Sequence, residues 1–315
     1  MRHVFRISGL MTLLLLLSGS FSAWAQPTGY SVNSRGNLED NSQVNALYRI
    51  DLSTGATEYI GWTSFIDIEG LAFSPNGVLY GAADDDNTLV RISTETGQAV
   101  AINNQRRNLN VPRGEILDSG LAFTCEGDLL MVSDRRRSLY QVSIDETRLE
   151  VVGEEGALNV PITAISVWGD QVYGIGQGLT SEDELDSPNL YRIDPTTGTT
   201  TLVGPLGAEA NPYANAGLAF DETGTLWAVT DRLQGFDIDI PSEILRIDPA
   251  TGTAEKVADA DIVGFESLAI GPPAGCDRGS PPPPTVVPTL SPLGLILLSF
   301  LLGLLATASI RSKFA

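Results

Sequence analysis

The sequence predicts an all-β protein, a five-bladed β-propeller, from three observations. Short apolar runs alternate with turn residues, as in residues 217–253, which hold four such runs and resemble a small antiparallel sheet. This unit recurs about every 50 residues, a period typical of propeller blades. The repeat region also begins and ends with complementary fragments of the unit. A ring closed by strands from both ends leaves no exposed sheet edge, whereas a sandwich or an open solenoid does not explain the complementary fragments.

The first element is a targeting segment, residues 1–25. Arg2 and Arg6 lie in a short basic region, residues 10–17 are apolar, and Ala23-Trp24-Ala25 before Gln26 fits cleavage after small residues. The alternative is an uncleaved anchor, but the apolar run is short for a membrane span. We expect a cleaved signal peptide.

The repeats follow in order over residues 26–273. Their opening strand recurs at intervals of 50, 44, 53 and 50 residues, and all but the last opening strand lead through a tight turn into a second strand. Third and fourth strands are joined by turns that mostly end in glycine, which supplies the positive φ that closes the turn. The turn at 143–148 has no glycine, so we expect it to be built differently. The opening strands are Leu71-Ala72-Phe73, Leu121-Ala122-Phe123, Ile165-Ser166-Val167, Leu218-Ala219-Phe220 and Leu268-Ala269-Ile270.

The fifth blade is divided between the two ends of this region. Residues 30–32 resemble a second strand, 46–50 a third and 56–60 a fourth, with no first strand before them. Residues 266–270 are a first strand with nothing after it. The two fragments together make one blade, which closes the ring.

The repeated pattern GLAF…G.LY…D…LYRIDP.TG, over residues 29–273, resembles bacterial propellers with YVTN, NHL or SMP-30-like blades. The resemblance implies the propeller fold. It does not imply one activity, because propellers carry many unrelated functions.

The tail begins with a linker, residues 274–286, whose prolines at 281–284 favour an extended spacer. Residues 293–310 are 18 uncharged, mostly apolar positions. As a helix they would be about 27 Å long, enough to span a bilayer. Arg311 and Lys313 follow this predicted transmembrane helix and favour a cytoplasmic C-terminus.

Residues 287–315 resemble the IPTL-CTERM sorting signal of Gram-negative bacteria. The motif reads Val287-Pro288-Thr289-Leu290-Ser291-Pro292-Leu293-Gly294, followed by the predicted helix and the basic end. The resemblance implies an inner-membrane intermediate, cleavage by a membrane transpeptidase of the exosortase type, and transfer to the cell surface or the extracellular space. The alternative is a plain single-pass anchor.

Charge and histidine content limit the function. The chain has a net charge of −20, and loss of both ends would leave 15 basic and 39 acidic residues, a net charge of −24. Such a field disfavours nucleic acid and favours cations and basic partners, although it also serves solubility. The only histidine, His3, leaves with the signal peptide. Its loss excludes Ser–His–Asp and Cys–His catalysis and His-ligated zinc in the mature protein.

The candidate site lies on the face that carries the long connections, at 103–118, 176–189, 205–215 and 231–243. Long loops over a rigid scaffold are where binding residues concentrate. Polar residues meet there in two sets, one before the first strands and one after the second strands. The first set is Glu69, Asp118, Asn215 and Glu266; the second is Asp84, Asp134, Gln177 and Asp231.

The first set would ring the mouth of the central channel. Its oxygens suit Ca²⁺ or Mg²⁺, and its placement resembles the metal positions of SMP-30-like lactonases. The alternative is that these residues cap turns and satisfy backbone amides. The acidic run 84–87 lacks the pattern of an EF-hand and is expected to be a solvated loop tip.

Cys125 and Cys276 are the only cysteines, and export would place them in an oxidising compartment. Both follow an innermost strand on the short-turn face, and residues 271–275 could carry the chain across the channel. We expect a disulfide, with two free thiols as the alternative.

The leading interpretation is a non-enzymatic surface propeller that binds a protein, glycan or matrix component through its loop-rich face. The alternative is a divalent-metal-dependent lactonase or esterase, in which a metal polarises a carbonyl and Asp118 or Glu266 moves the proton. The sequence determines neither the ligand nor the oligomeric state.

Overall fold

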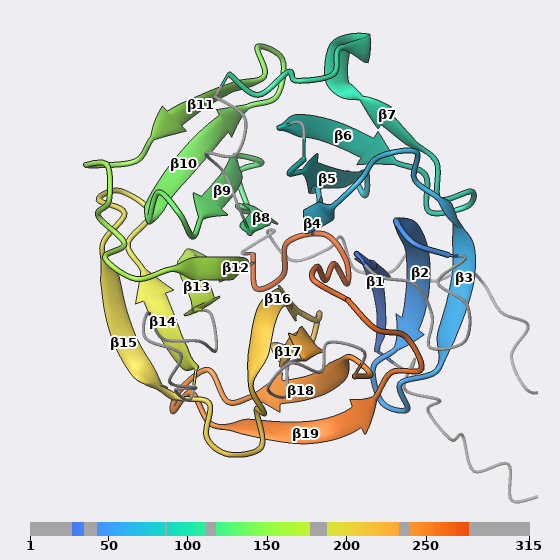
Figure 1. Ribbon diagram of the computed structural model, residues 1–315. Helices are drawn as coiled ribbons and strands as arrows, with labels where there is room; N and C mark the ends of the chain where they lie inside the picture. The colour runs from blue at the N-terminus through green and yellow to red at the C-terminus, as the bar shows by residue number, and fades with distance from the viewer. Residues whose placement is uncertain are drawn as a thin grey trace, which may run out of the picture. The chain divides into compact units, whose positions relative to one another are not determined.

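The computed structural model describes residues 27–34, 43–85, 87–110, 118–176, 188–232 and 240–276. Five sheets surround a central axis, which confirms the predicted five-bladed, all-β propeller (Figure 1). The predicted signal peptide, sorting tail and transmembrane helix lie outside the described residues. No helix in the described part of the chain is long and apolar enough to cross a membrane.

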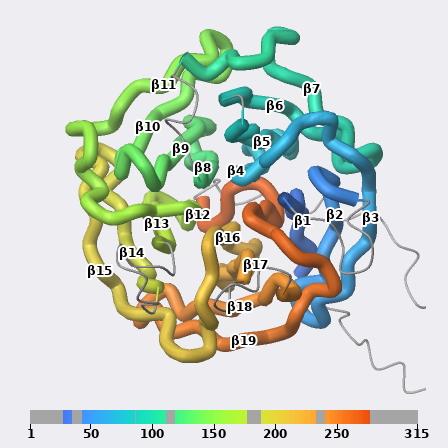
Figure 2. Tube along the Cα trace, in the orientation of Figure 1, coloured from blue at the N-terminus to red at the C-terminus, as the bar shows by residue number. Residues whose placement is uncertain are grey.

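Four blades follow one another along the chain, each with its strands in sequence order from the axis outward (Figure 2). Blade 1 is β4 (Ile68–Phe73), β5 (Leu79–Ala83), β6 (Thr88–Ile92) and β7 (Ala99–Ala101), followed by a short 3-10 helix η1 (Ile102–Asn104). Blade 2 is β8 (Ser119–Phe123), β9 (Leu129–Ser133), β10 (Ser138–Ser143) and β11 (Arg148–Val151). Blade 3 is β12 (Ile162–Trp168), β13 (Gln171–Gly176), β14 (Asn189–Ile193) and β15 (Thr200–Pro205). Blade 4 is β16 (Tyr213–Phe220), β17 (Leu226–Arg232), β18 (Glu243–Ile247) and β19 (Ala254–Asp259).

The closing blade combines both ends of the described chain, as predicted. β1 (Thr28–Val32), β2 (Ala46–Asp51) and β3 (Thr57–Trp62) form its three outer strands. The innermost position is taken by the C-terminal segment, through the antiparallel bridges Tyr30↔Ala269 and Asn33↔Phe265. The Tyr30 and Ala269 backbones exchange two hydrogen bonds of 2.7 and 2.9 Å. The ring is therefore closed by non-covalent pairing of segments about 240 residues apart.

Small residues let the innermost strands approach closely around the axis. A Cβ on Gly217 would lie 2.2 Å from the backbone of Ser267 and Leu268, and one on Gly120 would lie 2.8 Å from the Ala164 Cα. The glycine of the repeated GLAF pattern is therefore required because the innermost strands of the five blades pack closely around the axis. It does not mark a turn.

The arginine of the repeated LYRIDP pattern pairs across strands with an aromatic residue. Tyr173 lies opposite Arg192, whose guanidinium is 5.6 Å from the ring centre, and Trp227 lies opposite Arg246. Blade 2 replaces both partners, with Leu130 opposite Gln141. Arg192 thus covers the Tyr173 ring on the blade surface, whereas Arg246 forms an ion pair with Glu255.

Two of the outer turns show how the sequence exceptions are accommodated. In the turn at 194–198, Gly198 has a φ of 70°. In the glycine-free turn at 143–148, Thr147 takes the equivalent left-handed conformation with a φ of 51°. The turn at 143–148 therefore differs from the others in residue type and not in the sign of this φ angle. A left-handed conformation is strained for a β-branched residue such as Thr147.

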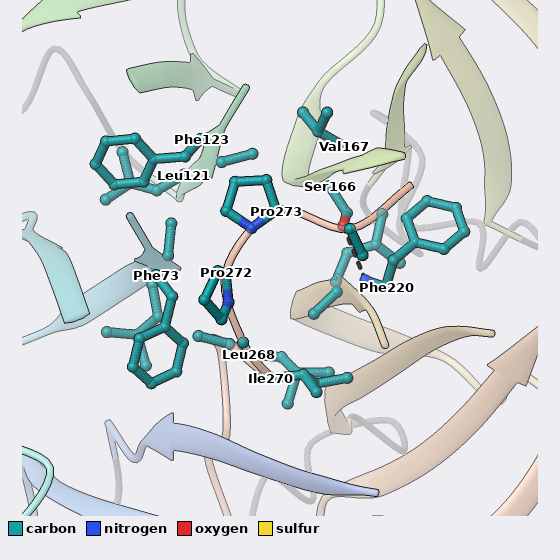
Figure 3. Close-up of a pocket in the computed structure, with 18 of the residues that line it drawn as sticks. Phe73, Leu121, Phe123, Ser166, Val167, Phe220, Leu268, Ile270, Pro272 and Pro273 are labelled. Atoms are coloured by element: carbon teal, nitrogen blue, oxygen red, sulfur yellow. Dashed lines mark hydrogen bonds between the residues drawn. The ribbon is translucent and has the colours of Figure 1, made fainter. Parts of the chain in front are cut away.

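The channel is covered on the short-turn face. After the last inner strand the chain crosses the axis, and the Gly169 N–H donates a 2.9 Å hydrogen bond to the Ala274 carbonyl. Pro272 and Pro273 lie among the side chains of the inner strands, around a cavity of about 40 Å³ (Figure 3). Cys125 and Cys276 form a disulfide just beyond, with their Cα atoms 5.5 Å apart.

Candidate functional site

The loop-rich end of the channel carries a group of acidic and amide side chains, which we call the acidic mouth. They lie where innermost strands begin and second strands end, and adjacent antiparallel strands bring these two positions together. Its described members are Asp67, Glu69, Asp84, Asp118, Asp134, Asn215, Asp231 and Glu266. Both predicted sets thus meet at one end of the channel, except Gln177, which lies outside the described residues.

The blades contribute to the mouth in pairs. The Asp84 N–H donates a 2.8 Å hydrogen bond to the Asp67 carbonyl, so these two residues face each other across β4 and β5. In blade 4, Asn215 lies directly opposite Asp231. The pairing of Ser119 with Ser133 places Asp118 and Asp134 in the corresponding positions of blade 2.

Asp67 is a member that the sequence reasoning missed. The register of β4 shifts between Ile68 and Gly70, so Glu69 is an extra residue in that strand. Asp67 therefore takes the place that Asp118 takes in blade 2, and both have left-handed backbones, with φ of 59° and 43°. The sequence did contain a signal for this residue, because Asp67 lies three residues before Gly70, whereas Asp118 lies two residues before Gly120.

The acidic run 84–87 also differs from expectation. It was predicted as a solvated loop tip, but Asp84 is only 7% exposed and Asn87 only 4%. The Asp84 Oδ1 atom is fully buried and has no hydrogen-bond partner. The loop turns its first residue into the acidic mouth because the end of β5 directly faces the start of β4.

Three carboxylates form the tightest group. One oxygen from each of Asp67, Glu69 and Asp84 lies within 4.8 Å of the other two, the only such set among the described His, Cys, Asp and Glu residues. The sequence instead predicted a ligand set of Glu69, Asp118, Asn215 and Glu266, of which only Glu69 belongs to this group.

The other predicted ligands have different partners. Asn215 donates through Nδ2 to the Asp118 Oδ1 at 3.2 Å, and its own Oδ1 accepts the Ala216 N–H at 2.7 Å. The Glu266 Oε1 accepts a 2.6 Å hydrogen bond from the Ser34 hydroxyl. Asn215 therefore turns its nitrogen, not its oxygen, toward the carboxylates, which favours a bridging role across the channel.

Burial and repulsion between neighbouring carboxylates raise the pKa values of acidic side chains in the mouth. Burial, with Asp67, Asp118 and Asp134 nearby, raises the pKa of Asp84 to about 7. Burial and Asp118 likewise raise the pKa of Asp134 to about 7, against the opposing effect of Arg135. Burial raises the pKa of Glu69 and of Glu266 well above the usual range. Such crowding favours uptake of a proton or of a cation.

The channel beneath the mouth is too narrow for a ligand. Glu69, the motif glycines and the inner leucines surround a void of only about 10 Å³, which offers room for about one water molecule. The opposite end is covered by residues 271–274. A ligand would therefore rest on the mouth and its loops.

Comparison with known proteins supports the repeats and the tail. A family described as "Repeat of unknown function (DUF6923)" matches residues 17–159, and the IPTL-CTERM motif matches residues 285–311. A comparison with curated proteins found no match.

Several solved structures are similar to this chain. A nidogen/laminin complex aligns with a TM-score of 0.46 and 14% identity, over 77% of this chain and 97% of that chain. Virginiamycin B lyase from Staphylococcus aureus aligns with a TM-score of 0.38 and 16% identity, over 67% and 62%. A protein described as "the putative gluconolactonase in protein family" aligns with a TM-score of 0.38 and 19% identity, over 62% of this chain and 63% of that chain.

The five blades, the repeat match and the matched tail lead to one conclusion: the chain is an exported β-propeller repeat protein with a C-terminal IPTL-CTERM sorting motif.

Proposed function

We propose that this protein is a non-enzymatic binding module that presents its loop-rich face to a ligand at the cell surface. The single observation that supports the proposal most strongly is the asymmetry of the two ends of the channel. One end collects the acidic mouth, and the other is covered by residues 271–274 and a disulfide. The sorting motif supports export and display at the cell surface, and a membrane enzyme of the exosortase type would remove the tail before that display.

The negative charge of the protein favours ligands that carry basic groups. The mouth is rich in carboxylates, and the whole chain has a net charge of −20. A surface component with exposed basic groups would be attracted to this field, and its association would weaken as salt increases. A protein, glycan or matrix component with such groups fits the mouth better than nucleic acid or an anionic membrane.

The test compares two faces of the exported protein. Asp118→Asn and Asp134→Asn together neutralise the centre of the mouth, and Glu222→Gln removes a charge from the turn after β16 on the opposite face. We expect binding to cells and extracellular matrix of the producing organism to fall at least tenfold for the first variant and to stay unchanged for the second. Equal binding by both variants would contradict the proposal.

A hydrolase is the second candidate, and one observation favours it. Asp84 and Asp134 have pKa values raised to about 7, which suits general acid–base catalysis at neutral pH. A bound divalent metal would supply Lewis-acid polarisation of a lactone or ester carbonyl. Turnover of such substrates by the exported protein, lost in Asp134→Asn, would favour this candidate over a binding module.

A further inference from the structure

We propose that Asp67, Glu69 and Asp84, with Asp118 beside them, form a Ca²⁺ site in blade 1 at one side of the acidic mouth. The proposal concerns the protein alone and does not depend on the ligand proposed above. It rests on the spacing of the oxygens, on an unpartnered buried oxygen, and on the way the neighbouring blade orients the carboxylates.

The spacing fits a single ion. Ca²⁺ binds oxygens at 2.3–2.6 Å, so two of its ligands can lie at most about 5 Å apart. The oxygens of Asp67, Glu69 and Asp84 lie within 4.8 Å of one another. They come from the start of β4 and the end of β5, two paired strands of one rigid blade, so the group is held by the sheet rather than by a free loop.

Burial makes the group costly without a positive charge. Glu69 is 5% exposed and Asp84 is 7% exposed, and the Asp84 Oδ1 atom has no hydrogen-bond partner. Within the described residues, no lysine or arginine forms an ion pair with Asp67, Glu69 or Asp84. Burying negative charge without a compensating positive charge is unfavourable, and a divalent cation would offset it for the buried Glu69 and Asp84 and for the partly buried Asp67 together.

The neighbouring blade orients the carboxylates toward a shared centre. The backbone N–H of Ser119 donates a 2.9 Å hydrogen bond to the Glu69 Oε2 atom. The N–H of Asp118 donates to the Asp84 carboxylate, and Oδ1 is the oxygen left unpartnered. Consecutive backbone amides of blade 2 thus support two carboxylates of blade 1, as outer-shell donors do for metal ligands. Capping of the backbone alone would not explain the third carboxylate, Asp67.

The donor set selects the ion. Carboxylate oxygens are hard ligands that suit Ca²⁺ and Mg²⁺, and not the softer transition metals. Ca²⁺ accepts six to eight oxygens in flexible geometry, whereas Mg²⁺ requires a near-ideal octahedron and keeps several waters. A group of three carboxylates, of which Glu69 and Asp84 are buried and Asp67 is partly buried, matches the Ca²⁺ requirement better, with Asp118 as a further donor nearby.

The experiment measures Ca²⁺ binding to the purified exported protein after removal of metals with a chelator. Calorimetric titration should give one site per chain, and the melting temperature should rise by several degrees in Ca²⁺ compared with chelator. Asp84→Asn should lower the affinity at least tenfold and abolish the rise. Because this variant removes a buried unpartnered charge, it should melt in chelator no lower than the wild type, which separates loss of a ligand from loss of folding.

Asp231→Asn is the matched control. It removes a buried carboxylate of the same mouth in blade 4, so it should change the affinity by less than about threefold. An absence of stoichiometric binding in the wild type would overturn the proposal. Weak binding of several Ca²⁺ ions per chain, reduced equally by both variants, would also overturn it. Such a result would mean that the cations bind to the acidic surface as a whole and not to one site. Tighter binding of Mg²⁺ than of Ca²⁺ would overturn the assignment of the ion.

Discussion

At the scale of single residues, one aspartate shows how a turn is stabilised by its own side chain. In the turn after β16, the Asp221 Oδ1 accepts hydrogen bonds from the backbone and side chain of Thr223 and from the Thr225 N–H, and its Oδ2 accepts the Trp227 indole N–H at 2.9 Å. Burial raises the pKa of Asp221, but these hydrogen bonds outweigh it and leave the pKa below its usual value. The charged form is therefore the one that stabilises the fold.

Asp221→Asn should lower the free energy of unfolding by about 1–3 kcal/mol, because the amide cannot accept from both Thr223 and Trp227. The folded pKa lies below the unfolded value, so this contribution is complete above the unfolded pKa, about 3.9, and is lost as the pH falls through the folded pKa. Urea unfolding should thus show a constant difference from the wild type above about pH 5 and a smaller one at pH 3.

Glu222→Gln, the neighbouring charge in the same turn, serves as the control and should change the stability by less than about 0.5 kcal/mol. An equal effect of both substitutions, or a difference that grows as the pH falls, would show that the hydrogen bonds of Asp221 contribute nothing specific.

At the scale of single elements, the innermost strands depend on close backbone approach. A Cβ on Gly217 would meet the backbone of Ser267 and Leu268, which cannot rotate away. Gly271 has no atom within 4 Å of an added Cβ and an ordinary φ. The two glycines therefore differ in the space around them, although both lie close to the channel.

Gly217→Ala should destabilise the protein by at least about 2 kcal/mol, because blade 4 and the closing segment must move apart. Gly271→Ala should be within about 0.5 kcal/mol of the wild type. Thermal melting of the exported proteins measures both effects, and the interpretation fails if Gly217→Ala melts at the wild-type temperature.

A disulfide holds the end of the closing segment. It joins Cys125 to Cys276 across 151 residues, immediately after the segment that covers the channel. Chain-entropy estimates assign about 5 kcal/mol to a loop of this length, and measured losses are typically 2–5 kcal/mol.

A Cys125→Ser, Cys276→Ser double variant should unfold at lower denaturant concentration by an amount in this range. The wild type in reducing agent should behave like the variant, and the variant itself should not respond to reductant. Unfolding curves that coincide for the oxidised wild type and the variant would show that the pairing of Tyr30 with Ala269 closes the ring unaided.

At the scale of the whole molecule, the propeller ends shortly before the sorting motif begins. The compact unit extends to Cys276, and the IPTL-CTERM match begins at residue 285. A covalent bond thus fixes the last residue of the propeller, and any force on the tail would reach the disulfide before it reached the closing strand.

We predict that the mature surface form lacks the C-terminal part of the tail. Intact mass of the protein released from cells should fall short of a chain that ends at Ala315. Pro288→Ala with Thr289→Ala changes the motif and should leave the tail attached and the protein cell-associated. A released wild-type species that still ends at Ala315 would contradict processing at the motif.

The sequence was sufficient to predict the number of blades, the strand order and the complementary closing halves. These features follow from alternation and turn chemistry, which act over a few residues and repeat along the chain. It also placed both sets of polar residues at one end of the channel, since the direction of each strand is known once the repeat is recognised.

Which carboxylates meet could not be predicted from the sequence, because it depends on strand register and on contacts between blades. One extra residue in β4 places Asp67, rather than Glu69, opposite the end of β5. The register between the strands brings Asp84 into the same group. The backbone amides of residues 118 and 119 in the next blade orient the carboxylates. A bulge changes the direction of a side chain without leaving a clear mark in composition. Contacts between blades, moreover, join residues about 50 positions apart, which no local pattern records.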